Sequence, residues 1–95
     1  MNTYELTRCT ADTAVATGKR ILHTISIAPT TGTPTAGLVT VYDSTAESGT
    51  ALYSEWVFAT TPGHTITLDT ICRTGIYVGY DATLANVTVT VTHSA

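Results

Sequence analysis

Charged side chains are scarce in this sequence of 95 residues. Asp, Glu, Lys and Arg make up only 12% of it, whereas a typical soluble domain has about 25%. The four Lys and Arg residues form no basic stripe, and the net charge is −3. This composition excludes the electrostatic footprint of a nucleic-acid-binding protein, so we expect no nucleic-acid partner.

Long apolar runs are also missing, and none approaches the roughly 20 residues that cross a bilayer as a helix. The N-terminus has no basic segment followed by an apolar one, so no secretory signal is visible. We therefore expect no membrane partner and synthesis in a cytosol. Cys9 and Cys72 lie far apart in the sequence, and in a reducing compartment they are expected to be small buried apolar residues, with their pairing left open.

No stretch shows a useful helical period, but strand patterns are plain. In the segment Gly75–His93 (GIYVGYDATLANVTVTVTH), Val87, Val89 and Val91 alternate with threonines without a break. Alternation of β-branched residues with a period of two predicts a strand with one buried and one exposed face. The valines are therefore expected to face a core.

Similar runs are separated by turns rich in Pro, Gly, Asp and Ser. They cover Tyr4–Thr10, Arg20–Ala28, Leu38–Asp43, Leu52–Ala59, His64–Cys72 and Ile76–Tyr80. Frequent turns between short strands predict an all-β fold, a single β-sandwich or jelly roll of about six to eight antiparallel strands. We expect residues 19–95 to form this domain and residues 1–18 to be an N-terminal arm or an edge strand, the arm being removable without unfolding.

The alternation also assigns faces. Ile21 is expected to share the core face with His23, Ile25 and Ile27, and Trp56 with Phe58 and Leu52. The opposite faces, and the N-terminal run, then provide an apolar patch with hydroxyl groups, which is typical of a protein interface. The candidate interface residues are Tyr4, Leu6, Leu22, Tyr53, Val57 and Tyr77.

Catalytic and metal-binding motifs are absent from the sequence. His23, His64 and His93 have no local partners at metal-ligand spacing, and no Gly-x-Ser-x-Gly segment is present. Asp43, Asp69 and Asp81 each fall where a strand is expected to end, where Asp serves turns. We expect no catalytic residues, no metal, no cofactor and no enzymatic activity. Gly79 is expected to permit close approach of a neighbouring group.

The C-terminal half contains Thr74–Val78 (TGIYV), a turn at Asp81–Ala82 and the valine–threonine strand Asn86–Thr92. In these features it resembles small virion proteins of tailed bacteriophages. Upstream, Gly37–Asp43 followed by Ser44–Thr50 resembles the strand and Ser/Thr/Gly turn of the same family. The similarity extends over roughly Lys19 to His93.

This resemblance implies a β-sandwich that decorates or cements a phage capsid. Its partners would be the major capsid protein or other virion subunits. It would also form a homo-oligomer, for example a trimer. It would be assembled in the host cytoplasm and lie on the capsid surface of the virion. The alternatives are a tail, head–tail or baseplate component, and a carbohydrate-binding module. A carbohydrate-binding module requires exposed aromatic rings in a row, so burial of Trp56 would remove its best residue.

Overall fold

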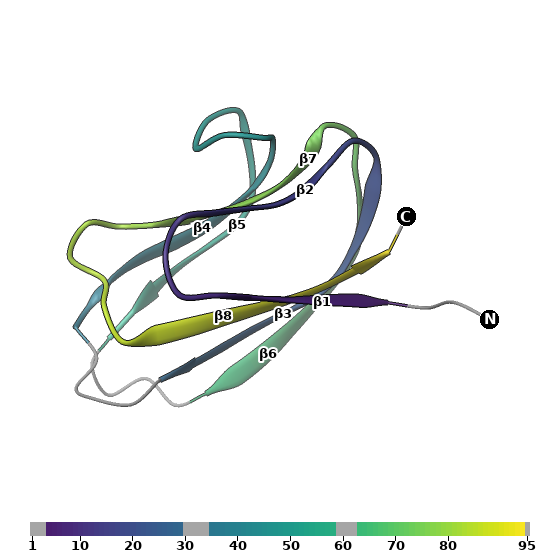
Figure 1. Ribbon diagram of the computed structural model, residues 1–95. Helices are drawn as coiled ribbons and strands as arrows, with labels where there is room; N and C mark the ends of the chain where they lie inside the picture. The colour runs from purple at the N-terminus through teal and green to yellow at the C-terminus, as the bar shows by residue number, and fades with distance from the viewer. Residues whose placement is uncertain (1–3, 30–34, 59–62, 95) are drawn as a thin grey trace.

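The computed structural model describes residues 4–29, 35–58 and 63–94. Within these ranges the chain forms two four-stranded antiparallel sheets that pack face to face (Figure 1). One sheet has the order β1-β8-β3-β6 and the other β2-β7-β4-β5. The strands are β1 (Glu5–Cys9), β2 (Thr13–Thr17), β3 (Arg20–Pro29), β4 (Gly37–Asp43), β5 (Thr50–Val57), β6 (His64–Cys72), β7 (Gly75–Tyr80) and β8 (Val87–Ser94). The predicted all-β sandwich is confirmed.

The core lies between the sheets and is built mainly from aliphatic side chains. Val87, Val89 and Val91 of β8 are at most 2% exposed, while the threonines between them are half-buried, as their alternation predicted. Val39 and Val41 of β4 are fully buried in the same cluster. Cys9 and Cys72 are buried free thiols, and burial raises the pKa of both, the latter to about 11.

The face assignment of β3 is wrong for its first part because the strand contains a bulge. Leu22 pairs with His93 and Thr24 with Thr92, so His23 has no counterpart on β8. Because a bulge inserts one extra residue, the side chains before it point to the opposite sheet faces from those that an unbroken alternation would give. Leu22 therefore faces the core with Ile25 and is 0% exposed, whereas Ile21 is 39% exposed.

The face assignment of β5 is wrong for Trp56 and Phe58, whereas Leu52 packs against the core as expected. Val57 is buried, whereas Trp56 is 47% and Phe58 59% exposed. The reason is register, since Val39 of β4 pairs with Glu55 and Val41 with Tyr53, and directly paired residues share a sheet face. Pairing with the buried valines of β4 thus turns Tyr53, Glu55 and Val57 towards the core, although the opposite face of β5 is more hydrophobic.

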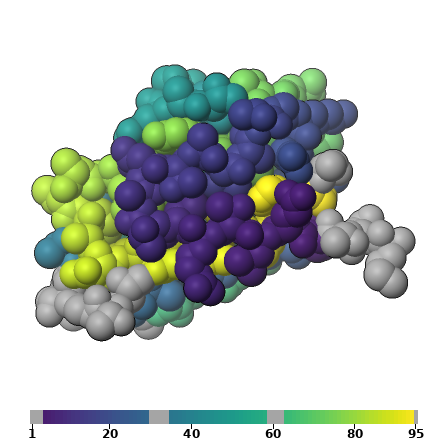
Figure 2. All heavy atoms as spheres, viewed as in Figure 1, coloured from purple at the N-terminus to yellow at the C-terminus, as the bar shows by residue number. Residues whose placement is uncertain are grey.

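The first strands are integral edges of the sandwich. β1 pairs with β8 along five residues and β2 pairs with β7, so the N-terminal segment contributes one edge strand to each sheet. Figure 2 shows this segment as a purple band on one side of the molecule. The strand β2 was not predicted because its sequence TAVAT lacks a strong strand pattern. Backbone pairing with β7 stabilises it as a strand.

Tyr80 links the two sheets beside this segment. Its hydroxyl group lies 2.8 Å from the carbonyl oxygens of both Cys9 and Val87, and its backbone N–H donates to Asp12 at 2.6 Å. Burial is the main cause that raises the pKa of Tyr80, which therefore stays protonated. A residue of one sheet thus satisfies polar groups of two strands in the other.

Candidate functional site

The six predicted interface residues do not form one surface. Tyr4 (41%) and Leu6 (62%) are exposed. Leu22 and Val57 are corrected to core residues, because the β3 bulge and the β4–β5 register turn them inward. The remaining two, Tyr53 and Tyr77, are half-buried.

The outer face of the β1-β8-β3-β6 sheet is rich in hydroxyl groups. Its register places Leu6 beside Thr92, Thr92 beside Thr24, and Thr24 beside Thr67. The next row contains Arg8, Thr90, Ser26 and Thr65, and the apolar pair Ile21–Ile71 lies near the other end. We call this set the hydroxyl face: Leu6, Arg8, Ile21, Thr24, Ser26, Thr65, Thr67, Ile71, Thr90 and Thr92.

Many hydroxyl groups of this face are already paired with one another. Thr24 bonds to Thr92, and Ser26 to Thr65 at 2.9 Å. Two of the apolar members, Leu6 and Ile71, are more than half exposed. Arg8 is the charged member of the set, and the exposed Asp69 lies between Thr67 and Ile71 on the same side of β6. Neutral, internally paired hydroxyl groups cost less to remove from water than ionised side chains, so this face is suited to contact with another protein.

A small aromatic cluster adjoins the hydroxyl face. The ring of Tyr4 stacks on His23 with centroids 4.2 Å apart, and Nδ1 of His23 contacts the carboxylate of Asp69. Asp69 has φ +48° and lies inside β6. The prediction that it ends a strand is therefore wrong. His23 is therefore held by local partners, and it anchors Tyr4 at the edge of the sheet.

The outer face of the other sheet presents a second group of exposed apolar residues. Trp56 pairs with Leu38, and its ring contacts Phe58 at a centroid distance of 6.3 Å with 65° between the planes. Trp56 is not buried, so the carbohydrate-binding alternative keeps that residue. However, the edge-to-face arrangement does not give the two rings a common plane on which a chain of sugars would lie.

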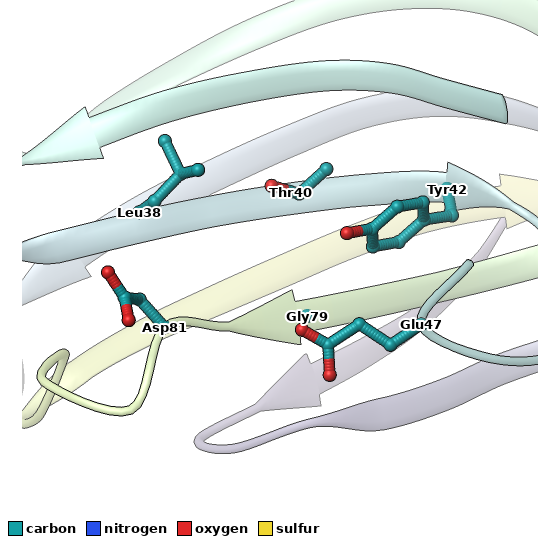
Figure 3. A pocket seen from close by; sticks show the side chains of 6 residues that line it. All are labelled: Leu38, Thr40, Tyr42, Glu47, Gly79 and Asp81. Atoms are coloured by element: carbon teal, nitrogen blue, oxygen red, sulfur yellow. The ribbon is translucent and has the colours of Figure 1, made fainter. Parts of the chain in front are cut away.

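A pocket of about 300 Å³ lies on this same sheet (Figure 3). Leu38, Thr40 and Tyr42 of β4 form one wall, Gly79 of β7 lies opposite, and the carboxylates of Glu47 and Asp81 lie towards opposite ends. A Cβ atom at Gly79 would lie 3.2 Å from the Glu47 side chain. This confirms that Gly79 permits close approach, and the group it admits is a carboxylate.

The described residues assemble no group of three or more His, Cys, Asp or Glu side chains that would hold a metal ion. The same part of the chain contains no helix long and apolar enough to cross a membrane. Two histidines are hydrogen-bonded to acids, His23 to Asp69 and His64 to Glu55, the latter at 2.8 Å. These pairs join β3 to β6 and β5 to β6, so each also serves the packing of strands.

His93 is a buried titratable group whose stability effect has a definite sign. It is 2% exposed, its Nε2 lies 3.3 Å from the Thr7 hydroxyl, and its Nδ1 lies 3.7 Å from Glu5. Burial is the dominant influence and lowers the pKa of His93 below 6.5, although Glu5 opposes the shift and Arg20 adds to it. The neutral imidazole is therefore the native form.

We expect the urea midpoint of unfolding to fall as the pH drops from 7.5 to 5. Below the unfolded pKa of 6.5 the unfolded chain binds a proton at position 93 more readily than the native protein, so acid favours unfolding. Stability from this group is complete above that pH and is lost towards the lower folded pKa. Urea titrations of His93→Gln should show a flatter dependence, and an unchanged slope in this variant would contradict the assignment.

Comparison with protein-family models, with curated proteins and with solved structures finds no match to this chain.

Proposed function

We propose that the protein is a structural component of a tailed-phage virion, a decoration or cement protein that binds the assembled capsid shell through its hydroxyl face. The observation that carries the proposal is the character of that face. It spans four strands, includes exposed Leu6 and Ile71, and carries few charges, namely Arg8 and the neighbouring Asp69 of β6. The resemblance of residues 19–93 to small virion proteins supports the same function.

The mechanism follows from linkage. A protein that binds only the assembled shell lowers the free energy of that state by an amount set by its concentration relative to its dissociation constant. A thousandfold excess over that constant corresponds to about 4 kcal/mol per site. Binding therefore requires no chemical step, only a surface from which water can be removed at a low cost in free energy.

Strand edges supply a second means of attachment. The edge strands are β1 and β6 in one sheet and β2 and β5 in the other, and β5 and β6 are the longer pair. Open edges present unpaired backbone groups that add strands from another chain. β-Augmentation between copies, or between this protein and a capsid subunit, would extend the contact beyond the hydroxyl face.

The proposal predicts co-sedimentation with undecorated shells assembled from the major capsid protein of the same phage. The variant Leu6→Glu/Ile71→Glu should bind at least about tenfold more weakly, because burying one such side chain contributes about 1.5–3 kcal/mol and 1.4 kcal/mol is tenfold in affinity. A control is Phe58→Glu, which adds one charge to a comparably exposed side chain that directly follows β5 of the other sheet.

Three results would contradict the proposal. Absence of wild-type protein from sedimented shells, together with retention on a glycan array, would favour the carbohydrate-binding alternative. Loss of binding in the Phe58→Glu control, with normal binding by the Leu6→Glu/Ile71→Glu variant, would assign the contact to the other sheet. Sedimentation with purified tails in place of shells would indicate the tail or baseplate alternative.

A further inference from the structure

The pocket on the β2-β7-β4-β5 sheet is bordered by two acidic side chains, Glu47 and Asp81, that find no partner among the described residues. The protein has seven Asp and Glu residues. Five of them accept a hydrogen bond or form an ion pair among the described residues: Glu5, Asp12, Asp43, Glu55 and Asp69. For Glu47 and Asp81 the described part of the chain provides no basic side chain within ion-pair distance and no donor to the carboxylate.

Both carboxylates are positioned by the fold. The side chain of Glu47 lies against Gly79. A Cβ atom on Gly79 would lie only 3.2 Å from it, so the lack of a side chain at position 79 leaves room for Glu47. Asp81 is held through its backbone, since its N–H donates to the Leu38 carbonyl at 2.9 Å and its own carbonyl accepts from Leu84 at 3.0 Å. Two negative charges thus border one pocket, and residues 4–29, 35–58 and 63–94 provide no ion pair for either of them.

The wall along β4 suits a basic side chain whose charged group lies between the two carboxylates. Leu38 and Tyr42 offer apolar and aromatic surface, and Thr40 lies between them on the same strand face. A planar guanidinium group pairs with a carboxylate through two hydrogen bonds and stacks on an aromatic ring, as an ammonium group does less well. At about 300 Å³, the pocket lies at the small end of the range for ligand sites, which favours one side chain over an extended ligand.

We propose that this pocket binds an arginine side chain of a protein partner, with Glu47 and Asp81 as its anionic ligands and Tyr42 as the stacking wall. The inference rests on the proposed function and deepens it. A cement protein must hold two neighbours together, and the pocket lies on the sheet opposite the hydroxyl face. One sheet would then contact the shell by apolar burial and the other a second subunit by charge complementarity.

The test uses the whole 15N-labelled chain and titrates it with Nα-acetyl-arginine N-methylamide at low salt. We expect saturable shifts of the backbone amides of Thr40, Gly79 and Asp81. The neutral isostere Nα-acetyl-citrulline N-methylamide should bind at least tenfold more weakly, because it keeps the shape and lacks the charge. Added salt should weaken binding of the arginine compound only.

Matched variants identify the ligands. Glu47→Gln and Asp81→Asn should each weaken arginine binding several-fold and their combination more than tenfold, whereas Glu5→Gln, which removes one charge from the other sheet, should leave it unchanged. The proposal is overturned if the shifts do not saturate, if citrulline binds equally well, if Glu5→Gln has the same effect, or if cellobiose binds more tightly. None of these results depends on shell binding, so this proposal and the proposed function fail separately.

Discussion

Deletion of residues 1–18 is expected to abolish cooperative unfolding. The deletion removes β1 and β2, and with them the buried side chains of Cys9 and Ala16. It also leaves the buried Tyr80 hydroxyl without its Cys9 acceptor and the Tyr80 N–H without Asp12. Losing one edge of both sheets together with these bonds is comparable with the entire stability of a small domain, about 5–15 kcal/mol.

Thermal unfolding followed by near-ultraviolet circular dichroism and by calorimetry would check this result. The control is a chain that begins at Tyr4, which retains all the residues of β1 and β2 and should melt close to the full-length protein. A cooperative transition in the chain that begins at Lys19 would show that the N-terminal segment is a removable arm. The edge pairing of β1 and β2 predicts the opposite outcome.

The substitution Gly75→Ala is expected to destabilise the protein by about 3 kcal/mol, the upper end of the usual cost of overpacking. A Cβ atom at this position would lie 2.6 Å from the Ala16 carbonyl oxygen and 3.0 Å from that of Ser44. Both atoms belong to the backbone, so neither moves without displacing its segment. In a domain of this size the loss corresponds to a fall in Tm of at least about 10 °C.

The matched control for this prediction is Gly79→Ala in the same strand. The Cβ atom at Gly79 would meet only the Glu47 side chain, at 3.2 Å, and a flexible glutamate can shift by a few tenths of an ångström. Its Tm should therefore change by no more than a few degrees. Equal destabilisation by the two substitutions would show that the loss of glycine in β7 matters, rather than the contact at position 75.

Sequence patterns predict most strands of this protein but not the faces of all of them. In β8 the valines and threonines differ in polarity at every step, so the pattern identifies the buried face directly. In β5 both faces carry large apolar residues, and the choice between them depends on pairing with Val39 and Val41 of β4. A prediction based on hydrophobicity alone therefore placed Trp56 in the core and Val57 at the surface.

The candidate sites were less predictable than the fold. Leu22 was expected at the surface because no local pattern reveals the bulge at His23, which depends on pairing with β8. The pocket brings together Glu47 and Asp81, which are 34 positions apart and have no motif around them. A hint was present in Gly79, since a glycine within a strand pattern often marks close approach of another group.

By itself, the sequence determined the fold class, the location of seven of the eight strands and the burial of the β8 valines. These properties depend on local alternation and on turn residues, which act over a few positions along the chain. Only the tertiary structure decided that the N-terminal segment closes both sheets, that Trp56 is exposed and that two acids border one pocket. The reason is register, because pairing with a distant strand determines which side of a strand faces the core, and a single bulge reverses it.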